Sequence, residues 1–177
     1  MQKIALSAAL TLALVLPVMA QDQAGAIASF IDAEGTEIGD VTLTQAEGGV
    51  SINGEVMGLA SGKHGFHFHE TGDCDATTKF DSAGKHFNPT DRKHGLENPD
   101  GPHAGDLPNI AATAPGLASI ELTSDMISLN EGDPAYVFDE DGTALVVHAA
   151  ADDNVTDPSG NSGDRIACAV IEAPTEP

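Results

Sequence analysis

After an apolar stretch at its N-terminus, the chain alternates short hydrophobic runs with turns that contain glycine and acidic residues. Runs of about four to eight residues in which apolar and polar side chains alternate are typical of β-strands that bury one face. We expect strands at residues 26–31, 37–44, 50–57, 64–70, 110–113, 117–122, 126–129, 144–149 and 166–171. No window after residue 16 keeps a helical period. The pattern therefore predicts an all-β fold, an antiparallel sandwich or barrel.

Two long segments interrupt this pattern. Residues 71–109 have little strand character, and residues 150–164 form a second loop that is acidic and contains glycine. Loops of this length in a compact domain are usually functional or held in place by a bound group or a cross-link. The first loop carries side chains that bind metals or form disulfides: Cys74, His86, His94, His103 and Asp106. We therefore expect both loops to be functional.

Length and charge narrow the possible functions. The chain has 177 residues, a formal charge of −21 and only 7 lysines and arginines. The length suits one domain. A protein that binds nucleic acid or an anionic membrane needs basic residues that displace counterions, so the sequence excludes these as main partners.

The N-terminus is typical of a secretory signal peptide. Lys3 supplies a short positive region, residues 4–16 are apolar, and residues 17–20 give a small-residue cleavage pattern that ends at Ala20. A single-span anchor is the weaker alternative, because a membrane crossing needs about 20 apolar residues and no positive flank follows. We expect removal of residues 1–20, which takes away one positive charge and leaves −22 on a domain of residues 21–177. That domain is expected to be periplasmic or secreted, without membrane attachment.

Histidines provide the candidate chemistry. His67 and His69 lie two residues apart in an expected strand, so their rings share one face, and His148 follows the apolar run of another strand. Three imidazoles on rigid strands suit copper, zinc or iron. Three imidazoles and a carboxylate in the long loop would make a closed zinc site: His86, His94, His103 and Asp106. Histidines scattered over a solvated surface are the alternative that the spacing leaves open.

Cys74 and Cys168 are the only cysteines. An exported protein meets an oxidising compartment, which favours a disulfide between them over two separate buried thiols. Neither cysteine belongs to a CxxC pair, so redox catalysis by these thiols is disfavoured.

The same residues occur in segments that resemble the copper/zinc superoxide dismutases. The matching segments, in the order of that family, are GFHFHE (65–70), GDC (72–74), SAGKHFNP (82–89), RKHG (92–95), HAGDL (103–107), LVVH (145–148), ADD (151–153) and GDRIACAVI (163–171). Together they span nearly all of the expected mature chain. The resemblance implies a Greek-key antiparallel β-barrel of about eight strands with two long functional loops.

The resemblance also implies residue roles. The residues that match the copper ligands are His67, His69, His86 and His148. Those that match the zinc ligands are His86, His94, His103 and Asp106, with His86 as the imidazolate shared by both metals. Asp152 matches a carboxylate that links the far sides of His67 and His94. Arg165 matches the arginine that docks the anion beside copper.

The implied activity is dismutation of superoxide to dioxygen and hydrogen peroxide by redox cycling of copper, with one copper and one zinc ion per subunit. As copper is reduced, the family's bridging imidazole, here His86, leaves it and takes a proton. An exported metal buffer without turnover is the rival interpretation. It is disfavoured because family members that act as chaperones lack some copper ligands, whereas this sequence keeps all four matches and Arg165. The family includes homodimers, and the sequence leaves the oligomeric state open.

Other residues near the motifs are expected to be structural. His64 has no counterpart among the ligands and should make a packing or hydrogen-bonding contact near the copper strand. Phe66 and Phe68 alternate with the ligands and should enter the core. Lys85 is favoured as a plain surface lysine over a residue that assists anion approach.

Overall fold

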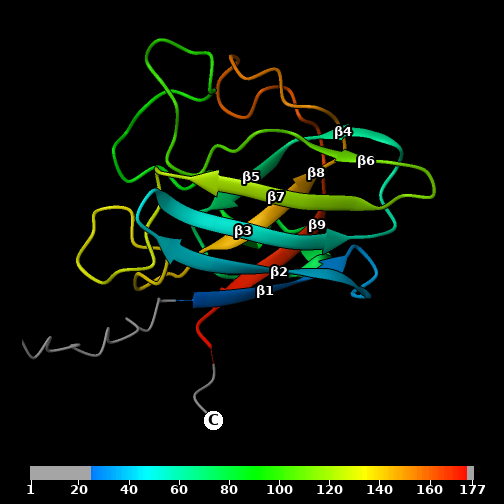
Figure 1. The fold of residues 1–177 in the computed structure, drawn as a ribbon. Helices are drawn as coiled ribbons and strands as arrows, with labels where there is room; N and C mark the ends of the chain where they lie inside the picture. Colours follow the sequence, from blue (N-terminus) through cyan, green and yellow to red (C-terminus); the bar gives the residue numbers. More distant parts are fainter. Residues whose placement is uncertain (1–24, 175–177) are drawn as a thin grey trace, which may run out of the picture.

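The structure, a computed structural model, describes residues 25–174. In that part of the chain it contains nine strands and two short 3₁₀ helices (Figure 1). The strands are β1 (Gly25–Asp32), β2 (Glu37–Ala46), β3 (Gly49–Val56), β4 (Gly62–His64), β5 (Phe66–His69), β6 (Ile110–Ala112), β7 (Ala118–Ser124), β8 (Ala144–His148) and β9 (Arg165–Glu172). The 3₁₀ helices are η1 (Ala76–Thr78) and η2 (Asp81–Ala83). Within residues 25–174, no helix has the length and hydropathy that a membrane span requires.

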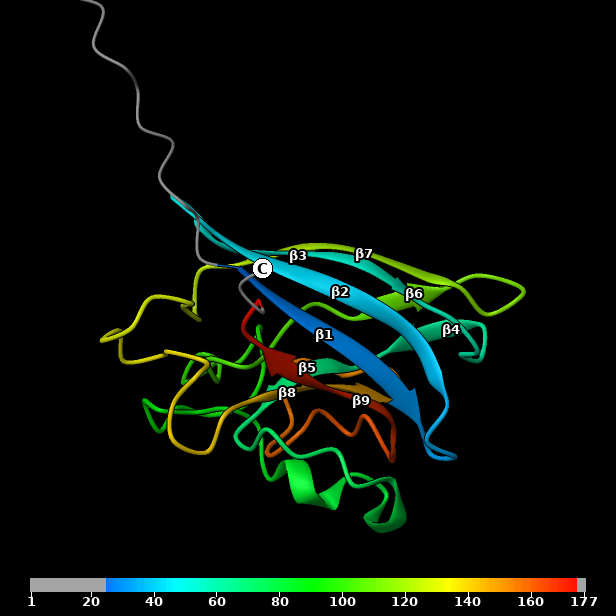
Figure 2. The same ribbon diagram turned by 90° about the horizontal axis from the view of Figure 1, so that it is seen from below.

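Seven strands form one antiparallel sheet in the order β5-β8-β9-β1-β2-β3-β7, and β4 pairs with β6. The sheet curls, so that β2, β3 and β7 lie over β5, β8 and β9 (Figure 2). Strand β1 joins the two halves because it pairs with β2 on one side and β9 on the other. The predicted all-β, antiparallel fold is confirmed.

The core lies between the two halves of the curled sheet. In β1, Ala26, Ala28 and Phe30 are buried and the residues between them are exposed, as expected for a strand with one solvent face. Phe66 and Phe68 of β5 are completely buried, as predicted, and the ring of Phe66 lies 6.1 Å from that of Phe30. Removing a phenylalanine side chain from water contributes about 1.5–3 kcal/mol. The apolar side of β5 therefore anchors a strand whose other side carries the histidines.

Two strand predictions need correction. The predicted strand at residues 126–129 is wrong: Ile127 and Leu129 are buried, but the segment is a bend with a single bridge at Ser128. Its apolar residues fill the core without pairing along a strand. The predicted strand at residues 64–70 is divided at Gly65, where an added Cβ would lie 2.8 Å from the side chain of Ser162.

The two long loops lie side by side at one side of the barrel (Figure 1). Their backbones meet where the Glu97 N–H donates to the Asn154 carbonyl at 3.0 Å. The predicted disulfide between Cys74 and Cys168 is present and ties the start of the first loop to β9. The expected signal peptide, residues 1–20, lies outside the described residues.

Candidate metal centre

Strands β5 and β8 supply three imidazoles from a rigid surface. His67 and His69 alternate with the core phenylalanines of β5, and His148 ends β8, which pairs with β5. A fourth imidazole comes from His86 in the first long loop. The backbone of His86 pairs with that of His69 in an isolated antiparallel β-bridge. All four side chains are buried. Strand alternation thus directs the rings of His67 and His69 away from the core phenylalanines.

The four rings aim unpartnered nitrogens at one point. The ligand atoms of this copper-type cluster lie within 4.8 Å of one another, and its members are His67, His69, His86 and His148. Among the described residues, four buried side-chain nitrogens lack a hydrogen-bond partner: His67 Nδ1, His69 Nε2, His86 Nε2 and His148 Nε2. Each buried polar atom left unsatisfied costs about 1–3 kcal/mol. One bound cation would satisfy all four, and four imidazoles suit copper, zinc or iron.

A second cluster surrounds Asp106. Its carboxylate Oδ1 lies 3.0 Å from Nδ1 of His86, 3.0 Å from Nδ1 of His94 and 3.4 Å from Nδ1 of His103. The backbone N–H groups of Gly95 and His103 donate to Oδ2 at 2.8 and 3.0 Å and hold the carboxylate in place. Three imidazoles and one carboxylate form a closed donor set that suits a structural zinc ion.

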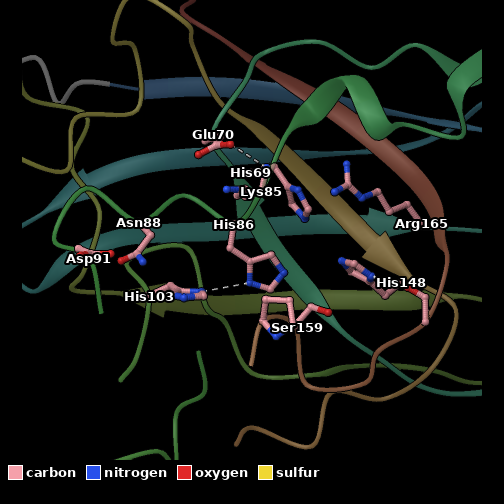
Figure 3. Close-up of a pocket in the computed structure, with 12 residues that line it drawn as sticks. His69, Glu70, Lys85, His86, Asn88, Asp91, His103, His148, Ser159 and Arg165 are labelled. Carbon is pink, nitrogen blue, oxygen red and sulfur yellow. Dashed lines mark hydrogen bonds between the residues drawn. The ribbon is translucent and has the colours of Figure 1, made fainter. Parts of the chain in front are cut away.

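His86 belongs to both clusters. Its Nε2 is one of the unpartnered nitrogens of the first cluster, and its Nδ1 faces Asp106 in the second. Figure 3 shows its ring between His103 on one side and His69 and His148 on the other. One imidazole can therefore contact two metal ions.

Asp152 contacts one ring of each cluster, at the ring nitrogen that points away from the cluster. Nε2 of His67 and Nε2 of His94 lie 2.5 and 3.1 Å from its carboxylate. Burial alone would raise the pKa of Asp152, but the hydrogen bonds with His67 and His94 hold it below the ordinary range. A carboxylate behind a ligand ring fixes the ring's orientation and tautomer. Gly160 makes room for it, because an added Cβ there would lie 1.7 Å from Asp152 Oδ1.

Burial sets the charge of most rings. Desolvation lowers the pKa of His86 to about 4 and that of His148 to about 3, and it holds the pKa of His69 well below the ordinary value. At neutral pH these rings are uncharged, which is the form that binds a metal. Burial also opposes protonation of His94, but its hydrogen bonds with Asp106 and Asp152 outweigh burial and raise its pKa to about 9.

A pocket of about 420 Å³ opens onto the first cluster. Its lining includes His69, His86 and His148, with Arg165 on one wall and Ser159 on another (Figure 3). The guanidinium of Arg165 donates to two backbone carbonyls, those of Phe80 and Gly84, at 2.5 Å each. A fixed cation beside a metal cluster can dock a small anion.

The residues that match the metal ligands lie together at this centre with Asp152 and Arg165, and the structure adds details that the sequence did not show. His64 makes the predicted contact near the copper strand, since its Nδ1 lies 2.7 Å from the His148 carbonyl. Lys85 is exposed, as favoured, but it also lines the pocket. The sequence did not single out Asn109, Asp157 or Gly160, because amide, acid and glycine residues are common in any loop.

Comparisons with known proteins indicate one family. The family model described as copper/zinc superoxide dismutase (SODC) matches residues 37–171. Superoxide dismutase (Cu-Zn) 2 of Aquifex aeolicus (strain VF5) is 45% identical over 145 residues, which are 81% of this chain and 84% of that protein. The Cu-Zn superoxide dismutase of Caulobacter vibrioides is 47% identical over 142 residues, 78% of this chain and 80% of that protein. A crystal structure of a SOD-like protein from Bacillus subtilis superposes with a TM-score of 0.78 at 38% identity and covers 81% of this chain and 96% of that one.

Proposed function

The chain belongs to the copper/zinc superoxide dismutase family and is an oxidoreductase that dismutes superoxide, and we propose that it works with one copper and one zinc ion bridged by His86. One observation carries this proposal. Four buried imidazole nitrogens without partners converge on one point, and one of those rings faces a second cluster around Asp106.

Each metal has its own set of ligands in this proposal. The copper ligands share an unpartnered ring nitrogen: His67, His69, His86 and His148. The zinc ligands are Asp106 and the three histidines whose rings contact its carboxylate: His86, His94 and His103. Asp152 orients the rings of His67 and His94 from outside both sets.

The chain's own residues bind the substrate and handle the proton. Bound copper supplies one-electron redox chemistry, while zinc has no accessible redox step and supplies charge and order. Arg165 docks superoxide, because its guanidinium remains protonated and is fixed at the pocket wall by the carbonyls of Phe80 and Gly84. With zinc held at Nδ1, beside Asp106, His86 Nε2 would be the ring atom free to hold a proton.

The enzyme acts outside the cytoplasm in this proposal, as the mature chain of residues 21–177. The sequence of residues 1–20 supports export, and so does the disulfide between Cys74 and Cys168, which persists in an oxidising compartment. N-terminal sequencing of the exported protein tests this, and we expect the mature chain to begin at Gln21.

Metal content measured together with cyanide-sensitive superoxide consumption tests the proposed centre. We expect copper and zinc near one each per chain, with rapid consumption of superoxide. His69→Ala should lose copper and keep zinc, because His69 belongs only to the first cluster. The matched variant His103→Ala should lose zinc and keep part of the copper. A protein with both metals but no activity would contradict the proposal.

A further inference from the structure

Asp157 lies in the second long loop and reaches across to the segment that carries His94. Its Oδ1 accepts a hydrogen bond from the backbone N–H of His94 at 2.7 Å. Its Oδ2 lies 2.9 Å from Nζ of Lys93. One carboxylate therefore holds two successive residues of the first long loop.

These two contacts differ in their importance. The side chains of Lys93 and Asp157 are 62% and 39% exposed, and an ion pair of that exposure contributes little. His94 is completely buried, and the backbone N–H of a buried residue requires a partner. The hydrogen bond to His94 is thus the contact that gives Asp157 its role.

Other contacts bring the two loops together without replacing this bond. The Asn154 carbonyl accepts the N–H of Glu97 at 3.0 Å, and an added Cβ at Gly95 would lie 2.1 Å from that same carbonyl. Asn98 Nδ2 also crosses between the loops and donates to the carbonyl of Val155 at 3.2 Å. Among the described residues, only Asp157 accepts the N–H of His94.

The residues directly after Asp157 belong to the substrate side of the site. Pro158 and Ser159 line the pocket that also contains Arg165 and His148. The carboxylate of Asp157 therefore joins the backbone of one second-cluster histidine to the loop that forms a wall of the pocket.

We propose that Asp157 is a positioning residue of the zinc site, which fixes the backbone of His94 against the loop that walls the anion pocket. The inference rests on the proposed role of His94 as a zinc ligand. The ring of His94 is held at both nitrogens, by Asp106 and Asp152. Asp157 adds an anchor at the backbone, so that the ring keeps its direction when either loop moves.

Three variants separate the hydrogen bond from the ion pair. Asp157→Ala removes both contacts, Asp157→Asn keeps an oxygen that accepts the His94 N–H, and Lys93→Met removes only the ion pair. Asp125→Ala is the matched control, because Asp125 is an exposed acid that follows β7, outside both long loops. Each variant is prepared as the full copper- and zinc-loaded protein.

The first measurement is the rate at which zinc passes to a chromophoric chelator at neutral pH, with retained copper measured in the same sample. We expect Asp157→Ala to release zinc about tenfold faster, the lower end of the effect of removing a partner that orients a metal ligand. Copper retention should not change. Asp157→Asn should restore the wild-type rate, and Lys93→Met and Asp125→Ala should stay within about twofold of it.

The second measurement is the visible spectrum of cobalt(II) placed in the zinc site, which reports ligand geometry. Asp157→Ala should change this spectrum, and Asp157→Asn should restore it. Wild-type zinc release from Asp157→Ala overturns the inference, and so does equal acceleration of zinc and copper loss, which would indicate a general loosening. Failure of the wild-type protein to bind zinc would instead refute the proposed function.

Discussion

Two hydrogen bonds join the side-chain amide of Asn109 to the backbone of Asp152. The Asp152 N–H donates to Asn109 Oδ1 at 2.7 Å, and Asn109 Nδ2 donates to the Asp152 carbonyl at 2.8 Å. Asn109 directly precedes β6, so it ties the second long loop to the barrel. The carboxylate behind both metal clusters is therefore positioned by a residue that touches neither cluster.

Replacement of this asparagine should weaken both the fold and the metal centre. Asn109→Ala leaves the buried N–H of Asp152 without its acceptor, which costs about 1–3 kcal/mol of unfolding free energy. Zinc content should fall as well, because Asp152 orients His94. Denaturant unfolding of the metal-loaded protein and metal analysis measure the two effects.

Asn53→Ala is the matched control for Asn109→Ala. Asn53 is exposed on β3, and its amide reaches only Ser51 Oγ on the surface. Its replacement should change the unfolding free energy by no more than about 0.5 kcal/mol. Equal effects of the two replacements would show that the amide of Asn109 does not position Asp152.

Alternation was enough to predict the strands that bury one face. It placed β1, β2 and β3 to within two residues at each end, because each packs one side on the core and leaves the other in water. It failed at residues 126–129, where Ile127 and Leu129 fill the core from a bend. Hydrophobic pattern reports burial, and burial alone does not identify a strand.

The histidine clusters were predictable in part, for a related reason. His67 and His69 are two apart in a strand, so their shared face follows from local geometry. The joining of these rings to the loop histidines, by contrast, came from the resemblance of whole segments to a known family. Asn109 and Asp157 act on residues 43 and 63 positions away, and nothing in their surroundings in sequence signals such contacts.

The first long loop should loosen before the barrel does when a ligand of the second cluster is removed. His94→Ala or Asp106→Ala should cause loss of zinc and early proteolytic cleavage between residues 71 and 109, because this segment contains few apolar anchors. Part of the copper should remain. Limited proteolysis and metal analysis check both effects.

Lys79→Ala controls for loop mutagenesis as such. Lys79 lies in the same loop, is exposed and contacts neither cluster, so its replacement should leave zinc content and cleavage unchanged. Full zinc occupancy in either ligand variant at neutral pH would show that the mutated residue is not a ligand.

Loss of the disulfide should lower stability and activity together. The bridge spans 94 residues, and in the chain-entropy model a loop of that size contributes about 4–5 kcal/mol at most. It also holds the segment whose carbonyls at Phe80 and Gly84 accept the guanidinium of Arg165. We expect Cys74→Ser to lower the unfolding free energy by several kcal/mol and to slow superoxide consumption. An unchanged thermal midpoint and rate would contradict this.

The mouth of the pocket carries side chains of both charges. Its cations are Lys85 and Arg165, and its exposed acids are Glu70 and Asp91. The second long loop contains no lysine, and three of its acids are engaged locally: Asp152, Asp153 and Asp157. The rest of the molecule is strongly acidic, with a formal charge of −21 for the whole chain.

Salt should therefore leave superoxide turnover unchanged or increase it. At about 0.01 M salt the Debye length is roughly 30 Å, so an approaching anion feels the repulsion of most of the surface. At about 0.15 M it is roughly 8 Å, and only the cations at the pocket and the bound metals remain effective. Electrostatic steering by a positive surface would give the opposite result, because salt screens the attraction and the rate of superoxide consumption then falls steeply.

Superoxide decay followed by pulse radiolysis across this range of salt concentration decides between the two. A steep fall would show that Lys85 and Arg165 focus the field over a distance longer than the acidic surface can oppose, and Lys85→Met would then abolish most of the salt dependence.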